Sequence, residues 1–244
     1  MDLGSIFNDA FDYTKKLFTD IGRLVILVVL DIIPIVNLVV VGYASKVAKE
    51  SPASKEPPLL TDYLGLWIQG LKVTIVAVIW MIAPIILIIG GFGLGAMGFQ
   101  KPFFAAGMLI GVLGILLAFI IAIILSMAIV HMVKHESIGK AFAAGEVFQI
   151  IGRIGWGKYI LWLLVIFIGI LVLSAIGSIP MVGWLISLIV GPPFAVLVAR
   201  SAGTIYQEGA SGAVTGVAEV RYCTKCGTRL TADAVFCPNC GQKV

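Results

Sequence analysis

The residues best suited to chemistry are four cysteines near the C-terminus, within the stretch CTKCGTRLTADAVFCPNC. They form two Cys-x2-Cys pairs that are separated by ten residues. Two turns at this spacing can offer four thiolates to one tetrahedral ion, most often zinc. A glycine follows each pair, where a tight turn around a sulfur favours a positive φ. We therefore expect one zinc ion bound by Cys223, Cys226, Cys237 and Cys240.

The role of this ion follows from its closed set of ligands. Four cysteines leave no coordination position for water, so we expect the zinc to be structural rather than catalytic. Leu230 and Phe236 are nearly the only core residues of this small module, which must therefore fold on its metal. Two disulfides, iron, or a redox role are the alternatives, and a reducing cytosol favours zinc among them.

A second candidate site lies in the first hydrophobic segment, RLVILVVLDIIPIVNLVVVGY. An ionised carboxylate at the centre of a bilayer costs at least about 2.5 kcal/mol, so such a group is by default a functional candidate. The possible intramembrane site, for a proton or a cation, consists of Asp31, Pro34 and Asn37. Its expected partners are Lys72 or Arg23. The alternative is a carboxylate that caps a helix or locks the bundle where proline breaks the backbone.

The last hydrophobic segment contains Gly191-Pro192-Pro193, which we expect to break or kink a helix. Such a break either lines a cavity or only shapes the bundle. Together with Asp31 and Asn37, it would line the pathway of a transporter or permeation protein.

Two other patterns resemble binding sites. His131 and His135 stand four residues apart, as in a two-histidine metal site, but HMVKHE lacks the HExxH order and no third ligand is evident. We interpret them as interfacial histidines at a helix C-terminus. Gly93-x-Gly95-x-x-Gly98 follows a membrane helix rather than a strand, so we do not expect a nucleotide site. Without a nucleophile near the histidines or a pair of carboxylates, we expect no enzymatic activity.

The composition places these residues in a membrane protein. The 244 residues are 60% hydrophobic and 12% charged, with a mean hydropathy of +1.08, whereas soluble domains average about 25% charged residues. The first apolar stretch lies too deep in the chain for a signal peptide and lacks a cleavage site. We expect a multi-pass protein of the cell membrane, in contact with the lipid bilayer.

The hydrophobic pattern predicts an all-α membrane bundle. Residues 23–43 are barely one bilayer long and contain the possible intramembrane site, so they form either a broken, re-entrant hairpin or a fifth span. Four other segments reach the length of about 20 residues needed to cross. They run from about Leu71 to Gly91, Phe104 to Val133, Tyr159 to Gly177 and Val182 to Ala202.

Shorter elements connect these spans. Amphipathic surface helices are predicted over residues 1–21 and 140–159. We also expect a short interfacial helix at 64–71 and a glycine-rich turn at 90–102, and the glycines of 107–114 provide small faces for close helix packing. The repeated IGR, followed by IPIV in one copy and IPMV in the other, indicates a quasi-repeat of surface helix plus hairpin.

Three regions follow along the chain. We expect an integral membrane helical domain at 1–206, a flexible linker at 207–221 and a zinc ribbon at 222–244. A re-entrant first segment puts 16 of the 17 Lys and Arg residues on one side and leaves Lys101 opposite; a span makes the split 13 to 4. Both arrangements place the C-terminus in the cytoplasm, and the re-entrant one, which also keeps the N-terminus there, obeys the positive-inside rule better.

Several stretches carry a family resemblance. IIPIVNLVVVGYASKVAKE, LLTDYLGLWIQGLKV and KAFAAGEVFQIIGR resemble the mostly archaeal membrane family known as domain of unknown function 4013, over about residues 5–210. The family's usual segment before its second span is replaced here by PPLLTDYLGLW. The tail is similar to the short zinc ribbons appended to many archaeal and bacterial proteins. Neither resemblance implies a reaction.

We therefore expect a non-enzymatic membrane component or adaptor whose cytosolic zinc ribbon binds a protein partner. The alternative is a transporter or permeation protein for a lipid, ion or small molecule. Nucleic acid is an unlikely partner on sequence grounds, because its case rests on Lys225, Arg229 and Lys243 alone. 

Overall fold

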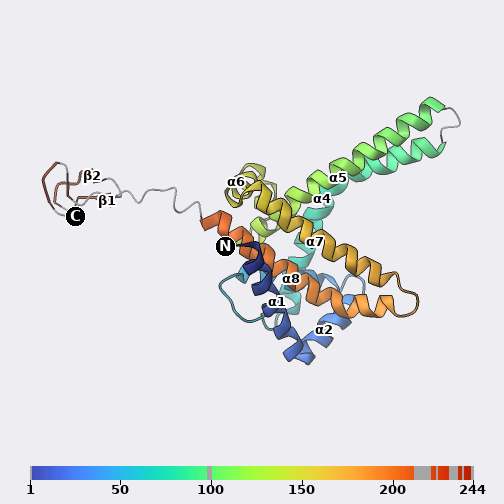
Figure 1. Ribbon diagram of the computed structural model, residues 1–244, viewed down its shortest axis with the longest axis horizontal. Coiled ribbons are helices and arrows are strands. Elements are labelled where there is room, and N and C mark those ends of the chain that lie inside the picture. Colours follow the sequence, from blue (N-terminus) through green and yellow to red (C-terminus); the bar gives the residue numbers. More distant parts are fainter. Residues whose placement is uncertain are drawn as a thin grey trace.

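The computed structural model describes residues 2–97, 101–211, 221–223, 225–230, 236–237 and 239–242. This part of the chain is almost entirely helical, as predicted (Figure 1). Its elements are α1 (Leu3–Thr19), α2 (Ile21–Ile32), α3 (Leu38–Glu50), α4 (Tyr63–Met97), α5 (Lys101–His135), the 3-10 helix η1 (Ile138–Phe142), α6 (Ala144–Ile154), α7 (Trp156–Gly177), α8 (Gly183–Ser211), β1 (Arg221–Tyr222) and β2 (Arg229–Leu230).

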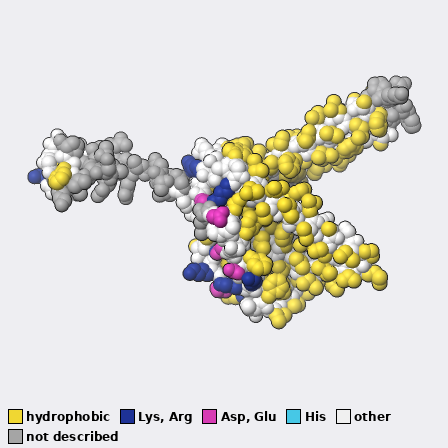
Figure 2. Space-filling view, viewed as in Figure 1, with side chains coloured by type: hydrophobic (Ala, Val, Ile, Leu, Met, Phe, Trp, Pro, Cys, Tyr) yellow, Lys and Arg dark blue, Asp and Glu magenta, His cyan; other side chains and the backbone are white. Residues whose placement is uncertain are grey.

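The four predicted spans are confirmed. Among the described residues, α4, α5, α7 and α8 are long and apolar enough to cross a membrane. They form two antiparallel hairpins, α4 with α5 and α7 with α8, which extend as separate arms from the end of the molecule where the N-terminus lies (Figure 1). Hydrophobic side chains cover both arms in Figure 2, and on this face the charged side chains gather around the N-terminal end. We call this the charged end; it includes the 51–62 loop and residues 134–146.

Two predictions about α4 are wrong. The interfacial helix expected at 64–71 is the first part of α4, because nothing separates it from the apolar run that follows. The glycine-rich turn expected at 90–102 is also helical through Met97, and its residues 98–100 lie outside the described part of the chain.

Glycines let α4 and α5 pack closely together. This close contact offsets the cost of placing glycine inside a helix. A Cβ added to Gly91 would lie 2.3 Å from the backbone nitrogen of Gly111, and one added to Gly107 would lie 2.3 Å from that of Gly95. The close packing predicted for Gly107, Gly111 and Gly114 is thus confirmed. Gly107 and Gly111 meet Gly95 and Gly91, two glycines that the sequence analysis assigned to a turn, whereas Gly114 packs against Leu87 and Ile88.

The first hydrophobic segment is a broken hairpin. At 12 and 13 residues, α2 and α3 are each about 18 to 20 Å long, which is too short for a bilayer core of about 30 Å. Arg23 at the start of α2 donates to the carbonyl oxygen of Pro57 (2.8 Å), and Tyr43 of α3 donates to that of Pro58 (3.0 Å). Since both helices contact the 51–62 loop, the hairpin starts and ends at the charged end. This favours the re-entrant arrangement over a fifth span.

The turn of this hairpin has a counterpart between α7 and α8. Ile35 in IPIV and Met181 in IPMV occupy the same place in the motif and have φ values of 71° and 66°. Each turn closes with a matching backbone bond, Asn37 N to Ile33 O (3.0 Å) and Gly183 N to Ile179 O (2.9 Å). A surface helix precedes each hairpin, α1 in one case and α6 in the other. The structure therefore supports the predicted quasi-repeat.

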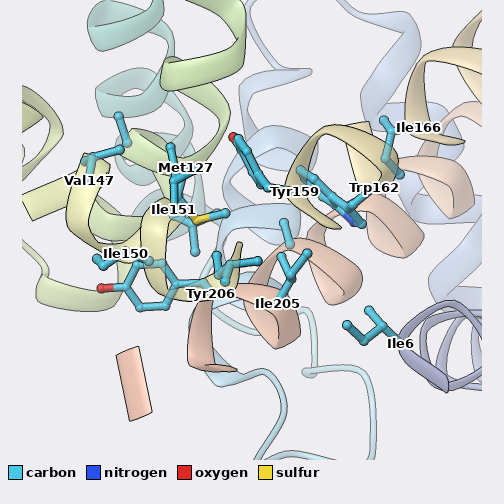
Figure 3. Packing of buried hydrophobic residues seen from close by; sticks show 14 residues of the cluster. Ile6, Met127, Val147, Ile150, Ile151, Tyr159, Trp162, Ile166, Ile205 and Tyr206 are labelled. Carbon is cyan, nitrogen blue, oxygen red and sulfur yellow. The ribbon is translucent and has the colours of Figure 1, made fainter. Parts of the chain in front are cut away.

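The surface helices are also packed into the domain. One face of α1, with Ile6, Ala10 and Leu17, is fully buried, whereas Phe11 is 54% exposed. Figure 3 shows the core that joins five helices, with Ile6 of α1 near Trp162 of α7 and Ile205 of α8, and with Met127, Ile150, Ile151, Tyr159 and Tyr206 beyond.

Helix α8 runs past residue 206, the predicted end of the membrane domain. Helix α8 continues to Ser211 because its last turns pack on α6 and α7. A Cβ added to Gly209 would lie 2.7 Å from the carbonyl oxygen of Ile150, and Glu208 is paired with Lys158 at 2.6 Å. Residues 212–220, the rest of the predicted linker, lie outside the described residues.

Candidate functional site

Two short turns build the cysteine site. In the first, the N–H of Gly227 donates to Cys223 O (2.8 Å) and the N–H of Cys223 to Thr228 O (2.9 Å). In the second, the N–H of Gly241 donates to Cys237 O (2.9 Å) and the N–H of Cys237 to Gln242 O (2.8 Å). The two glycines have φ values of 69° and 67°, as their place after each pair predicts. Both turns are thus the same structure, which presents two sulfurs from each pair.

The four sulfurs fit one tetrahedral metal ion. All lie within 4.8 Å of one another, and the closest Sγ to Sγ distances across the pairs are 3.5 Å (Cys223 to Cys240) and 3.6 Å (Cys226 to Cys237). Sulfurs about 2.3 Å from a tetrahedral zinc lie about 3.8 Å apart, so little movement is needed for binding. The Thr228 side chain and backbone lower the pKa of Cys226 to about 6, which favours the thiolate that binds metal.

Sulfur also forms the interior of this module. Cys223 and Cys237 are its buried residues among those described, and Cys240 packs against them. Phe236, predicted to be a core residue, is instead 59% exposed. The prediction was wrong because a site of four sulfurs already fills the centre, which leaves the ring outside. The described module has no apolar core that could replace the metal.

The histidines do not form a metal pair. His131 is buried, and both of its ring nitrogens are in hydrogen bonds, Nδ1 with the Tyr206 hydroxyl (2.7 Å) and Nε2 with Glu146 Oε2 (2.9 Å). His135 Nδ1 instead contacts the backbone oxygen of His131 (3.0 Å). Lys140 donates to Glu146, so one polar chain connects α5, α6, α8 and η1 at the charged end. The sequence analysis missed this network because its members are far apart in the chain.

Arg200 forms a second polar cluster that the sequence did not show. It is 3% exposed and lies on α8, where its guanidinium bonds both carboxylate oxygens of Asp9 on α1 (2.7 and 3.2 Å). It also donates to Ser54 O (2.7 Å), Pro52 O (3.3 Å) and the Ser51 hydroxyl (3.4 Å) and lies 4.5 Å from the centre of the Tyr13 ring. All five donors are used, so Arg200 connects α8 with α1 and the 51–62 loop.

The predicted intramembrane residues are partly brought together. Asp31 lies in the last turn of α2, and its Oδ2 would be 3.6 Å from a Cβ added to Gly191 of α8. Arg23 is not its partner: it pairs with Asp20 (2.8 Å). Lys72 is not paired with Asp31 either. Lys72 lies near Glu136, and the pKa of Glu136 is lowered chiefly by a hydrogen bond from Lys49.

The other residues of the possible intramembrane site are Pro34 and Asn37, and they lie where α2 turns into α3. Pro34 is exposed in the turn between α2 and α3, and Asn37 is the N-terminal residue before α3, where its side chain makes no capping hydrogen bond. Pro192 and Pro193 do not end α8, which remains helical through both. Proline fits a helical φ, and the burial of both rings against neighbouring helices offsets the lost backbone bonds.

This arrangement defines a class: a multi-pass helical membrane protein with an appended four-cysteine ribbon. The chain belongs to the family described as protein of unknown function (DUF4013), which matches residues 26–182. A zinc-ribbon domain matches residues 222–244. No curated protein and no solved structure matches the chain. The family assignment therefore agrees with the fold and brings no reaction with it.

Proposed function

We propose that this protein is a non-enzymatic membrane component whose ribbon binds one structural zinc ion and recruits a protein partner in the cytoplasm. The observation that carries the proposal is the ribbon itself. Its interior consists of cysteine sulfurs, and four sulfur ligands leave the ion no open position for a substrate. The proposed zinc therefore acts through the shape that it gives the ribbon.

The outer surface of the ribbon supports a docking role. Phe236 is 59% exposed, and Lys225 and Asn239 are exposed as well. An exposed aromatic ring on a small, otherwise polar module is typical of a protein-binding anchor. We infer a cytoplasmic C-terminus and N-terminus from the larger number of Lys and Arg residues expected on that side of the membrane.

The test compares partner capture by the full chain and by a chain truncated after Ser211, where α8 ends. Both are tagged, extracted from native membranes with a gentle detergent, and analysed by mass spectrometry. The proposal predicts partners that disappear with the ribbon and also with Phe236→Ala, a variant that keeps all four cysteines. Identical captures from the full and truncated chains would refute it. Binding of nucleic acid that weakens steeply with salt would replace the protein partner.

A second candidate function, transport, has one specific observation in its favour. Asp31 of α2 lies beside Gly191 of α8, so a carboxylate and the Pro192-Pro193 pair meet in the apolar part of the domain. Transport predicts that Asp31→Asn abolishes flux in proteoliposomes whereas Cys223→Ser spares it. The adaptor proposal predicts the opposite pattern for partner capture.

A further inference from the structure

We propose that Asp31, together with the backbone carbonyl oxygen of Leu188 on α8, binds a monovalent metal cation inside the membrane domain. The inference deepens the second candidate function, transport, because it names the ligand and the site. It does not depend on the ribbon.

The carboxylate has no protein partner among the described residues. Two arginines on the same helices are engaged elsewhere: Arg23 of α2 with Asp20 and Pro57, and Arg200 of α8 with Asp9 and the 51–62 loop. Asp31 neighbours exposed apolar residues such as Ile32 and Ile35, and along α8 Gly191 lies nine residues, or about 13 Å, from Arg200 at the charged end. An unpaired carboxylate in such surroundings requires a cation or a proton.

The end of α2 adds negative potential at the same place. Asp31 is the second-last residue of α2, and the last carbonyl groups of a helix carry partial negative charge. A carboxylate is unfavourable at this end of a helix, and a cation is favourable. The local backbone therefore favours a positive ligand beside Asp31.

Helix α8 supplies a further oxygen ligand. Pro192 and Pro193 lack an N–H, so the carbonyl oxygens of Leu188 and Ile189 do not receive their ordinary helical hydrogen bonds. A Cβ built on Gly191 would point toward the preceding turn of α8. Asp31 Oδ2 lies 3.6 Å from that Cβ position. Leu188 stands three residues before Gly191 and shares its side of the helix, whereas Ile189 is turned to the opposite side. The carboxylate therefore lies on the side of α8 where the Leu188 carbonyl oxygen lacks its helical hydrogen bond.

The chemistry of these ligands selects the ion. Carboxylate and carbonyl oxygens are hard ligands, which suit alkali and alkaline-earth cations. One carboxylate supplies a single negative charge, so a monovalent cation leaves the site neutral in apolar surroundings, whereas a divalent cation leaves an uncompensated charge. Sodium and potassium are therefore the cations to test.

The test measures binding without flux, on the full purified chain in lipid nanodiscs. Radiolabelled sodium binding and the unfolding temperature are measured in sodium or potassium chloride against N-methylglucamine chloride at equal ionic strength. We expect saturable binding and a higher unfolding temperature with one of the two metal cations. Both effects should persist in Asp12→Asn, a matched carboxylate 72% exposed at the charged end, and vanish in Asp31→Asn.

A second variant tests the carbonyl ligand while the charge stays in place. Pro192→Ala restores the N–H that bonds the Leu188 carbonyl oxygen in a regular helix, and should weaken cation binding at least about tenfold. Normal binding by this variant would overturn the carbonyl assignment. Equal cation effects in wild type and Asp31→Asn would overturn the site, and a dependence of stability on pH through Asp31 without a cation effect would assign it to a proton. Binding without flux would keep the site and refute transport.

Discussion

The helical domain and the ribbon bury different kinds of side chain. The domain has three clusters of apolar residues, and aromatic side chains such as Trp162 and Tyr43 are completely buried in it. Buried polar groups such as Arg200 then connect its helices at the charged end. The ribbon buries cysteine sulfurs and leaves its phenylalanine exposed. The domain can therefore fold on apolar packing, whereas the ribbon depends on a metal.

This difference separates the two parts energetically. Loss of the metal should unfold the ribbon and leave the helical domain folded. Loss of a helix contact should leave the four-sulfur site intact. Changes at distant, unconnected sites have additive effects on stability. The stability of the helical domain and the zinc content of the ribbon should therefore change independently.

The largest effect is expected for loss of a ligand. Cys237→Ser, or removal of the metal with a chelator, should abolish the fold of residues 221–242, because a structural zinc site contributes about 10 to 16 kcal/mol of binding free energy. The measurements are zinc content and protease cleavage within the ribbon. Lys225→Ala, a substitution of an exposed residue in the other cysteine turn, is the control. A ribbon that resists the protease without metal would contradict the conclusion that the ribbon, unlike the helical domain, depends on a metal.

Arg200→Ala should give the largest destabilisation of the helical domain. It leaves Asp9, which is 41% exposed, and two backbone oxygens of the 51–62 loop without their donor, and the loss of these hydrogen bonds costs up to about 3 kcal/mol. Unfolding of the domain in detergent, followed by tryptophan fluorescence, measures the change. Arg153→Ala on α6, where the arginine is exposed, should be nearly neutral, and zinc content should be unchanged in both variants.

Gly107→Ala should separate α4 from α5. The added Cβ would lie 2.3 Å from the backbone nitrogen of Gly95, and overpacking of this kind costs about 1 to 3 kcal/mol. At Gly93 nothing lies within 4 Å of an added Cβ, so Gly93→Ala should stabilise the helix by about 0.5 to 1 kcal/mol. Equal effects of the two variants on domain unfolding would show that the glycine contact is not tight.

The smallest effect concerns pH and Glu146 of α6. Hydrogen bonds from Lys140 and His131 lower the pKa of its carboxyl below the usual range. The ion pair therefore stabilises the packing of α6 above the unfolded-state pKa of about 4.3, and this stabilisation is lost as the pH falls through the lower folded-state value. Hydrogen exchange of residues 144–154, corrected for intrinsic rates, should rise in acid. In Glu146→Gln the exchange should lack this rise; a rise of equal size would contradict the assignment.

The sequence predicted what depends on local spacing. The positions of Gly227 and Gly241 indicated the two cysteine turns, and IPIV with IPMV indicated the repeated hairpin turn. Contacts between distant segments could not be predicted, because nothing local encodes them: Arg200 meets Asp9 across 191 residues, and Asp31 meets Gly191 across 160. The glycines of α4 were misread because a glycine favours both a turn and a close helix contact, and only the position of α5 distinguishes the two.

The measurement that tests the central claim most directly is partner capture by the full chain before and after metal removal, and again after zinc is restored. The account predicts that the captured proteins are lost with the metal, return with zinc, and never bind to Cys237→Ser. Asp31→Asn should capture them normally, since its site lies in the helical domain. Capture that is unaffected by metal removal and by Cys237→Ser would contradict the claim that the metal-folded ribbon recruits the partner.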